Sequence, residues 1–118
     1  MNPQIDGITQ DPPYLRFHPA EAMGDGSVVN EFMLAAMASR PGFSGSRFSV
    51  EPGARTPVDQ HAVAEIWMVA DGAGELEYDG RVVALEAGQV VYFAPFKPHS
   101  LHNTGDTPMT VFSIWWQQ

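Results

Sequence analysis

The stretch Gly53–Gly72, GARTPVDQHAVAEIWMVADG, carries the residues from which the rest of this chain is best interpreted. Three side chains that can bind a divalent cation, Asp59, His61 and Glu65, fall within seven residues of one another. Alternate residues of a β-strand point to the same face, so in a strand these three would share a face with Trp67. Carboxylates and imidazoles facing the inside of a barrel need a metal ion, a proton or each other to offset burial. The stretch therefore predicts a binding or catalytic site.

Short apolar segments separated by turn residues continue through the chain. Asp79-Gly80 gives the strongest hairpin signal and separates the expected strands 74–78 and 81–85. Three further segments with strand character are bounded by turn residues: 43–50, 90–96 and 109–116. About eight short strands at roughly 8–12-residue spacing, with no helix of any length, predict an all-β sandwich or barrel.

The chain of 118 residues is long enough to form one domain with its own core. We expect residues 1–26, which contain four prolines and little periodicity, to form an N-terminal arm. Residues 27–118 are then a single barrel domain. The segment 28–37 is ambiguous because its Ala, Met, Leu and Glu favour a helix, and we interpret it as a strand because the segments after it have strand character.

Composition and charge exclude several classes of function. The chain has no cysteine, which rules out disulfides, thiolate metal sites and cysteine nucleophiles. The net charge is −8 and the six Lys and Arg are scattered, which argues against nucleic acid as a partner. No apolar stretch approaches the roughly 20 residues that cross a membrane, and no secretory signal is visible, so a cytoplasmic location is the default expectation.

The spacing of the candidate ligands resembles the first motif of the cupin superfamily. That motif runs Gly, five residues, His-x-His, three or four residues, Glu, six residues, Gly. Gly53, His61, Glu65 and Gly72 hold the matching positions here, and Asp59 stands where the family usually has its first His.

A second stretch resembles the second cupin motif: Gly, five residues, Pro-x-Gly, two residues, His, three residues, Asn. Gly88, His99 and Asn103 hold their positions, while Ala94 and Phe96 replace the Pro and Gly. Together the two motifs cover about half of the chain. They are specific for the fold and weak for function, because this fold carries many chemistries.

The resemblance implies a double-stranded β-helix, or jelly-roll barrel, that usually forms a homodimer. It also implies that His61, Glu65 and His99 are metal ligands, with Asp59 as a candidate fourth. Two imidazoles and one carboxylate leave coordination positions open, and this oxygen-richer set favours one divalent ion of Fe, Mn or Zn. Asp59 could bind the ion, or accept a hydrogen bond from a ligand histidine. The alternative is a barrel that has lost its metal.

Several other residues are candidates for roles in the site. Glu65 or Asp59 could transfer a proton if not bound to the metal, and Tyr92 could offer its hydroxyl to a substrate. Trp67 is expected to wall an apolar pocket or to belong to the core. Arg47 is the basic residue nearest to the predicted pocket; we expect it to be solvated or salt-bridged, and the alternative is pairing with an anionic substrate.

Two histidines are expected away from the site. His102 has the opposite parity from His99, and His18 lies in the arm, so we expect both at the surface.

The sequence thus favours a small metal-dependent enzyme acting on a small organic molecule. The metal would serve as a Lewis acid or as a centre for O₂ chemistry, and the reaction could be oxygenation, isomerisation, cyclisation or lyase chemistry. Two alternatives stay open. One is a metal-free or metal-gated module that binds a small ligand, and the other is an epimerase-like barrel that uses His and Tyr without metal.

Overall fold

The computed structural model describes residues 14–37 and 39–117, which form nine β-strands and one short 3-10 helix. The expected all-β fold is therefore confirmed, and no helix among these residues is long and apolar enough to cross a membrane. The elements are, in order, β1 Glu21–Gly24, β2 Ser27–Glu31, η1 Leu34–Ala36, β3 Ser44–Val50, β4 Ala64–Asp71, β5 Ala73–Tyr78, β6 Arg81–Glu86, β7 Val90–Phe93, β8 His99–His102 and β9 Met109–Trp116.

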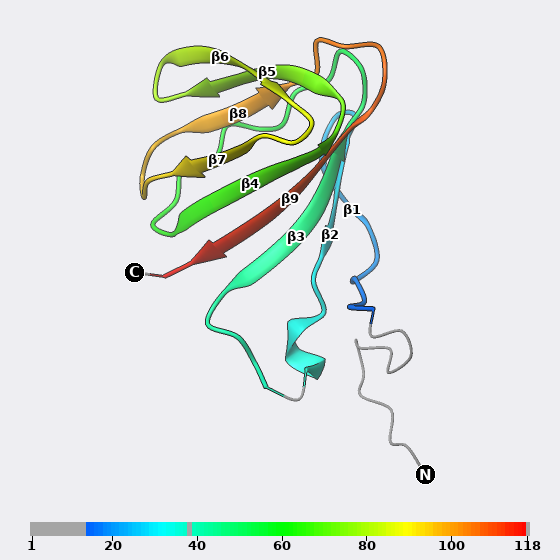
Figure 1. The fold of residues 1–118 in the computed structure, drawn as a ribbon, viewed down its shortest axis with the longest axis vertical. Coiled ribbons are helices and arrows are strands. Elements are labelled where there is room, and N and C mark those ends of the chain that lie inside the picture. The colour runs from blue at the N-terminus through cyan, green and yellow to red at the C-terminus, as the bar shows by residue number, and fades with distance from the viewer. Residues whose placement is uncertain (1–13, 38, 118) are drawn as a thin grey trace.

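The strands form two antiparallel sheets, as a jelly roll requires (Figure 1). The larger sheet has the order β1-β2-β3-β9-β4-β7, and the smaller has the order β6-β5-β8. Strands that neighbour each other in space are mostly distant in sequence, so the sheet is specified by long-range pairing. The core lies between the sheets and takes side chains from both: Phe48, Val50, Trp67, Val69, Leu76, Leu85, Phe93, Leu101, Met109 and Val111.

The N-terminal region differs in part from the sequence prediction. β1 pairs with β2 as a hairpin, so the expected boundary between arm and barrel at residue 26 falls inside that hairpin. Residues 1–13 of the expected arm lie outside the described residues. The strand expected over 28–37 is wrong in its second half, because β2 ends at Glu31 and the chain turns into η1, where helix-favouring residues decide the local structure.

The turns follow the glycine signals of the sequence. Asp79 and Gly80 have φ values of 49° and 82°, the pair of positive φ values that a two-residue hairpin turn of type I′ requires. Gly72, at the β4–β5 junction, has a φ of 85°, and a Cβ atom there would lie 2.8 Å from the side chain of Met109. These positions are fixed by backbone conformation and close approach.

Asn103 anchors the loop between β8 and β9. Its side chain is fully buried, and its Nδ2 donates to the carbonyl oxygens of Val50 at 2.9 Å and Thr107 at 2.8 Å. Its Oδ1 accepts from the amide of Gly105 at 2.9 Å. The second motif's asparagine is thus a structural residue that satisfies buried backbone groups.

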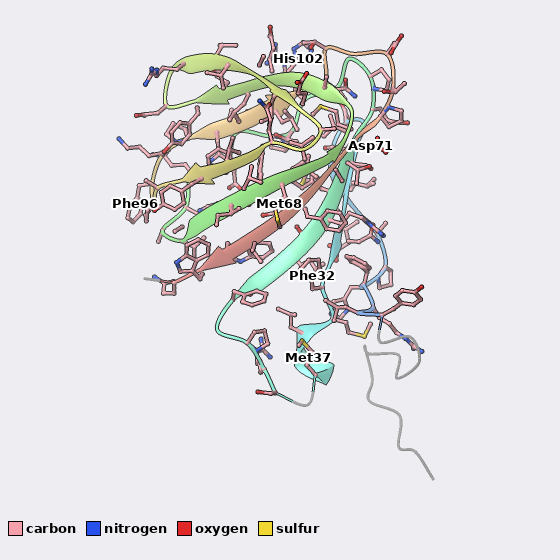
Figure 2. All side chains as sticks on the ribbon, viewed as in Figure 1. Phe32, Met37, Met68, Asp71, Phe96 and His102 are labelled. Atoms are coloured by element: carbon pink, nitrogen blue, oxygen red, sulfur yellow. The ribbon has the colours of Figure 1, made fainter. Side chains whose placement is uncertain are left out.

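Phe96 occupies the position where the second motif usually has glycine, and its φ is 66°. Its amide donates to the carbonyl of His61 at 2.7 Å, so the turn it forms supports the ligand loop. The ring contributes little to the core, because Phe96 is 63% exposed (Figure 2). A bulky residue in this left-handed region costs about 1–2 kcal/mol.

Phe96→Gly is therefore expected to raise the free energy of unfolding by about 1 kcal/mol, since relief of strain exceeds the entropy that glycine gains in the unfolded chain. Urea denaturation measures the change. Ala94→Gly is the matched control, because Ala94 has no positive φ, and this variant is expected to be destabilised. A Phe96→Gly protein no more stable than the parent would show that the turn carries no strain.

Candidate metal centre

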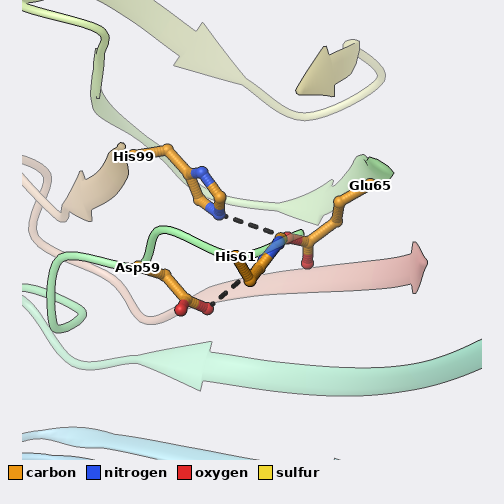
Figure 3. A group of neighbouring side chains, drawn as sticks. All are labelled: Asp59, His61, Glu65 and His99. Carbon is orange, nitrogen blue, oxygen red and sulfur yellow. Dashed lines mark hydrogen bonds and ion pairs between the residues drawn. The ribbon is translucent and has the colours of Figure 1, made fainter. Parts of the chain in front are cut away.

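Asp59, His61, Glu65 and His99 come together in space (Figure 3). One ligand atom from each lies within 4.8 Å of all the others. Glu65 and His99 belong to β4 and β8, and Asp59 and His61 come from the segment that precedes β4. The cluster thus joins the two sheets, because β4 belongs to the larger sheet and β8 to the smaller.

The loop residues reach the site by a different route from the one expected. β4 begins at Ala64, so among the residues expected to share this face, strand alternation places only Glu65 and Trp67 there. Asp59 is held by an isolated bridge to His99, in which the two residues exchange backbone hydrogen bonds of 2.9 and 3.0 Å. His61 is fixed through its carbonyl, which accepts from Phe96.

Both histidines present a bare ring nitrogen to the centre of the cluster. The Nδ1 atom of His61 lies 3.1 Å from the carbonyl of Val63, and that of His99 lies 3.0 Å from the carbonyl of Lys97. A carbonyl oxygen can only accept, so Nδ1 carries the proton in each ring and Nε2 carries the lone pair. The two Nε2 atoms lie 3.0 and 3.2 Å from Oε1 of Glu65.

The carboxylate of Glu65 is oriented by two donors on its other oxygen. Oε2 accepts a hydrogen bond of 2.9 Å from the indole of Trp67 and a second from the hydroxyl of Ser113. Glu65 is only 7% exposed, so these bonds decide which way the group points. Oε1 is left to face the two histidines.

Three lone-pair atoms thus converge on one point, and they repel each other unless a cation lies between them. In the protein without metal, a proton on Nε2 of His99 can fill this role, and the surroundings of His99 favour that proton. Burial by itself lowers the pKa of His99, but the hydrogen bonds to Glu65 and to the carbonyl of Lys97, together with the charges of Glu65 and Asp59, outweigh burial and leave that pKa raised above 6.5. Burial raises the pKa of Glu65, but the hydrogen bonds from His99, Ser113 and Trp67 outweigh it and leave that pKa lowered below 4.5.

The distances also fit a metal ion. Ligand atoms about 2.1 Å from one ion and at right angles to each other lie about 3.0 Å apart. The two Nε2–Oε1 distances, 3.0 and 3.2 Å, are close to this value, and Nε2 of His61 lies 3.7 Å from Oδ2 of Asp59. Two nitrogen and two oxygen donors suit Fe(II), Mn(II) or Zn(II). The residues present therefore fit a divalent ion.

The cluster opens into a cavity of about 490 Å³. Its walls come from β1 to β4, β8 and β9, together with the segment 56–63. Trp67 lines the cavity and also belongs to the core, so both expectations for this residue are met. The volume suits a small organic molecule.

Other candidate residues lie elsewhere. Tyr92 pairs with Ile66 on the outer face of the larger sheet, does not line the cavity and is 52% exposed, so it is not placed to offer its hydroxyl to a ligand there. Arg47 also faces outward, with its guanidinium 4.1 Å from the ring centre of Phe17. His18 is exposed and His102 half-buried, and neither lines the cavity.

Sequence reasoning missed Ser113, Trp115 and Glu31, all of which line the cavity. Ser113 and Trp115 share the parity of the buried Val111 in β9, and that parity is a signal in the sequence. The parity indicates which residues of β9 face inward. Which of them meet Glu65 depends on the register of β9 against β4, which the sequence does not show.

Comparisons with known proteins agree with the fold. The cupin domain family matches residues 46–115. The uncharacterized protein MJ1618 of Methanocaldococcus jannaschii is 25% identical over 88 residues, which are 74% of this chain and 70% of that protein.

Two solved structures are similar as well. A cupin 2 conserved barrel domain protein from Salinispora arenicola has a TM-score of 0.73 and 27% identity over 81% of this chain and 80% of its own. A cupin 2 domain-containing protein from Halorhodospira halophila has a TM-score of 0.71 and 30% identity over 80% of this chain and 66% of its own.

The fold and the cluster define a small jelly-roll protein with a group of residues that could hold a metal ion. The chain belongs to the cupin domain family.

Proposed function

We propose that this cupin is a small metal-dependent enzyme. It holds one divalent ion of Fe, Mn or Zn through His61, Glu65 and His99, with Asp59 making a secondary contribution to the affinity, and acts on a small organic molecule in the cavity. The observation that carries the proposal is the convergence of both Nε2 atoms on Oε1 of Glu65, with both Nδ1 atoms tied to carbonyl oxygens. When bound, such an ion supplies Lewis-acid or redox chemistry.

The protein's own residues orient the site and handle protons. Trp67 and Ser113 engage one oxygen of Glu65 and the histidines face the other, so Glu65 serves as a ligand and is poorly placed to carry a proton. Asp59 is better suited to proton transfer, since its side chain is 64% exposed and reaches the cavity. Oxygenation, isomerisation, cyclisation and lyase chemistry are all compatible with this arrangement.

Variants of Asp59 test its share in the site. Asp59→Asn keeps the shape and removes the charge, and we expect it to weaken metal affinity by about 10–100-fold. Asp59→His restores the usual cupin ligand and is expected to tighten binding if the loop accepts an imidazole. Isothermal titration with Mn²⁺ and Zn²⁺ measures both changes. The control is Asp106→Asn, an exposed acid in the β8–β9 turn; equal effects at the two positions would remove Asp59 from the site.

The second candidate is a metal-free module that binds a small ligand. It is favoured by the ion pair between Glu65 and His99, since a proton can replace the metal in neutralising the cluster. Absence of metal uptake by the folded parent protein would support this module. The epimerase-like alternative has less support, because all three tyrosines lie in the described residues and none lines the cavity.

We also infer a homodimer formed through the outer face of the larger sheet. Met68 lies on this face (Figure 2), and its pairing partners are apolar as well. Large exposed apolar patches mark interaction surfaces, and a second copy presents the same uncharged surface. The patch consists of Ile66, Met68, Val90, Tyr92, Phe112, Ile114 and Trp116.

Ile114→Lys is expected to convert the dimer to a monomer, because each interface would then bury unpaired charges. Sedimentation equilibrium at micromolar concentration measures the mass. Val82→Lys, at an exposed valine on the smaller sheet, is the control and should stay dimeric. A monomeric parent protein would contradict the dimer altogether.

A further inference from the structure

One row of paired residues crosses the cavity wall formed by the larger sheet. Glu31 pairs with Ser46, Ser46 with Ser113, and Ser113 with Trp67. Directly paired residues of an antiparallel sheet point to the same face, and all four line the cavity. The row therefore runs from β2 at one end to the cluster at the other.

The row has the acid Glu31 at one end, Trp67 at the other and two serines between them. Ser113 donates to Glu65 of the cluster, and Ser46 lies beside it with 4% of its surface exposed. Neighbouring strands are about 4.8 Å apart, so two strand spacings place Glu31 about 10 Å from Ser113. The carboxylate of Glu31 thus stands across a serine floor from the candidate metal ligands.

The sides of this floor are apolar. Phe48 and Trp115 also line the cavity, and each lies two residues from a serine of the row, on the same face of its strand. A ligand lying on the serines would contact aromatic surface on both sides. The part of the cavity above the serines therefore suits an elongated molecule with polar ends and an apolar middle.

Apart from the two histidines of the cluster, the ionisable residues that line the cavity are all acidic. Among the described residues that line it, Glu31, Asp59 and Glu65 are acidic, and none is Lys or Arg. Within residues 14–37 and 39–117, Glu31 forms no ion pair, whereas Lys97 is already paired with Asp79 at 3.2 Å. An anionic group at the β2 end would be repelled by the carboxylate of Glu31, and a cationic group would gain a partner.

We propose that the site takes a cationic small molecule, which places a metal-binding oxygen at His61, Glu65 and His99 and an ammonium or guanidinium group at Glu31. This inference rests on the proposed function, because it assumes an ion at the cluster. Glu31 is then a specificity-determining residue that reads the charge of the ligand's far end. Because the whole chain has a net charge of −8, it attracts cations in general, and a control variant at another acid is needed to isolate the effect of Glu31.

Three hydroxamates of matched length test the proposal on protein loaded with Zn²⁺. They are 6-aminohexanohydroxamic acid, hexanohydroxamic acid and adipic acid monohydroxamate, whose tails are cationic, apolar and anionic. The parent protein is expected to bind them in that order, as measured by calorimetry in physiological salt. Glu31→Gln should weaken the cationic probe by up to about fivefold, the size of an exposed charge pair, and strengthen the anionic one.

Glu75→Gln is the matched control, since it removes the same charge from an exposed position of β5 outside the cavity. It should leave the ratio of cationic to anionic affinity unchanged. An unchanged ratio in Glu31→Gln, or an equal change in Glu75→Gln, would overturn the proposal while leaving the metal site intact. Failure of the parent protein to take up Zn²⁺ in the loading step would overturn the proposed function and this inference together.

Discussion

Replacement of His99 or His61 by alanine is expected to abolish measurable metal binding, with a loss of affinity above about 100-fold. Outer residues of metal sites typically change affinity by about 10–100-fold, and a direct ligand should exceed this range. Each histidine supplies one of only two nitrogen donors in the cluster. Isothermal titration with Zn²⁺ and Mn²⁺ measures the loss.

His102→Ala is the matched control, because His102 lies on the same strand as His99 and outside the cavity. It should bind metal as the parent does. Circular dichroism must show the β-sheet signal of the parent in all three variants, since His99 is 2% exposed and its replacement leaves a space. Folded His61→Ala and His99→Ala proteins with parental affinity would show that the cluster is not a metal site.

Metal affinity is expected to rise steeply with pH. The Glu65 carboxylate raises the pKa of His99, despite the opposing effect of burial, so a proton competes with the metal for Nε2 up to a pH above 6.5. Below that raised pKa, each unit of pH should change the affinity about tenfold, since one proton is displaced for each ion bound. Between pH 5.5 and 6.5, both below that raised pKa, the affinity should therefore rise about tenfold. Titrations at four pH values provide the slope, and a flat profile would contradict the pairing.

The metal-free protein should respond to pH in the opposite sense. The raised pKa of His99 gives stability that is fully present below 6.5, its unfolded value, and is lost as pH rises through the folded pKa. The lowered pKa of Glu65 gives stability that is present above 4.5 and is lost as pH falls through the folded pKa. We therefore expect the metal-free protein to be most stable between about pH 4.5 and 6.5. Thermal unfolding over a range of pH, with and without Zn²⁺, measures the two opposite dependences on pH.

Most of the fold could be predicted from local signals. Asp79-Gly80 forms the expected hairpin turn because only a few residue types tolerate two positive φ values in succession. The alternation of Phe48 and Val50 with Arg47 correctly indicates which side of β3 is buried. η1 was missed because helix propensity competes with sheet pairing there, and the outcome depends on where β2 stops pairing with β3.

The residues of the cluster could be predicted from the sequence, but the way in which the fold positions them could be predicted only in part. Glu65 faces inward by strand alternation, whereas Asp59 and His61 are placed by backbone bonds to residues far along the chain. His99 could be joined to them only through the resemblance to cupins. Tyr92 faces outward because it pairs with Ile66, a register that local sequence does not encode. The same limit applies to the serine row, whose members lie on four different strands.

The metal content of the protein tests the central claim most directly. The protein should be purified without chelator or affinity tag, dialysed against Fe(II), Mn(II) or Zn(II), freed of excess ion and measured by elemental analysis. We predict one equivalent of a divalent metal per chain in the parent protein, and less than a tenth of that in His99→Ala, in line with a loss of more than about 100-fold in affinity. A folded parent protein that retains none of these metals would contradict the claim, and the cluster would then be a buried ion pair in a metal-free barrel.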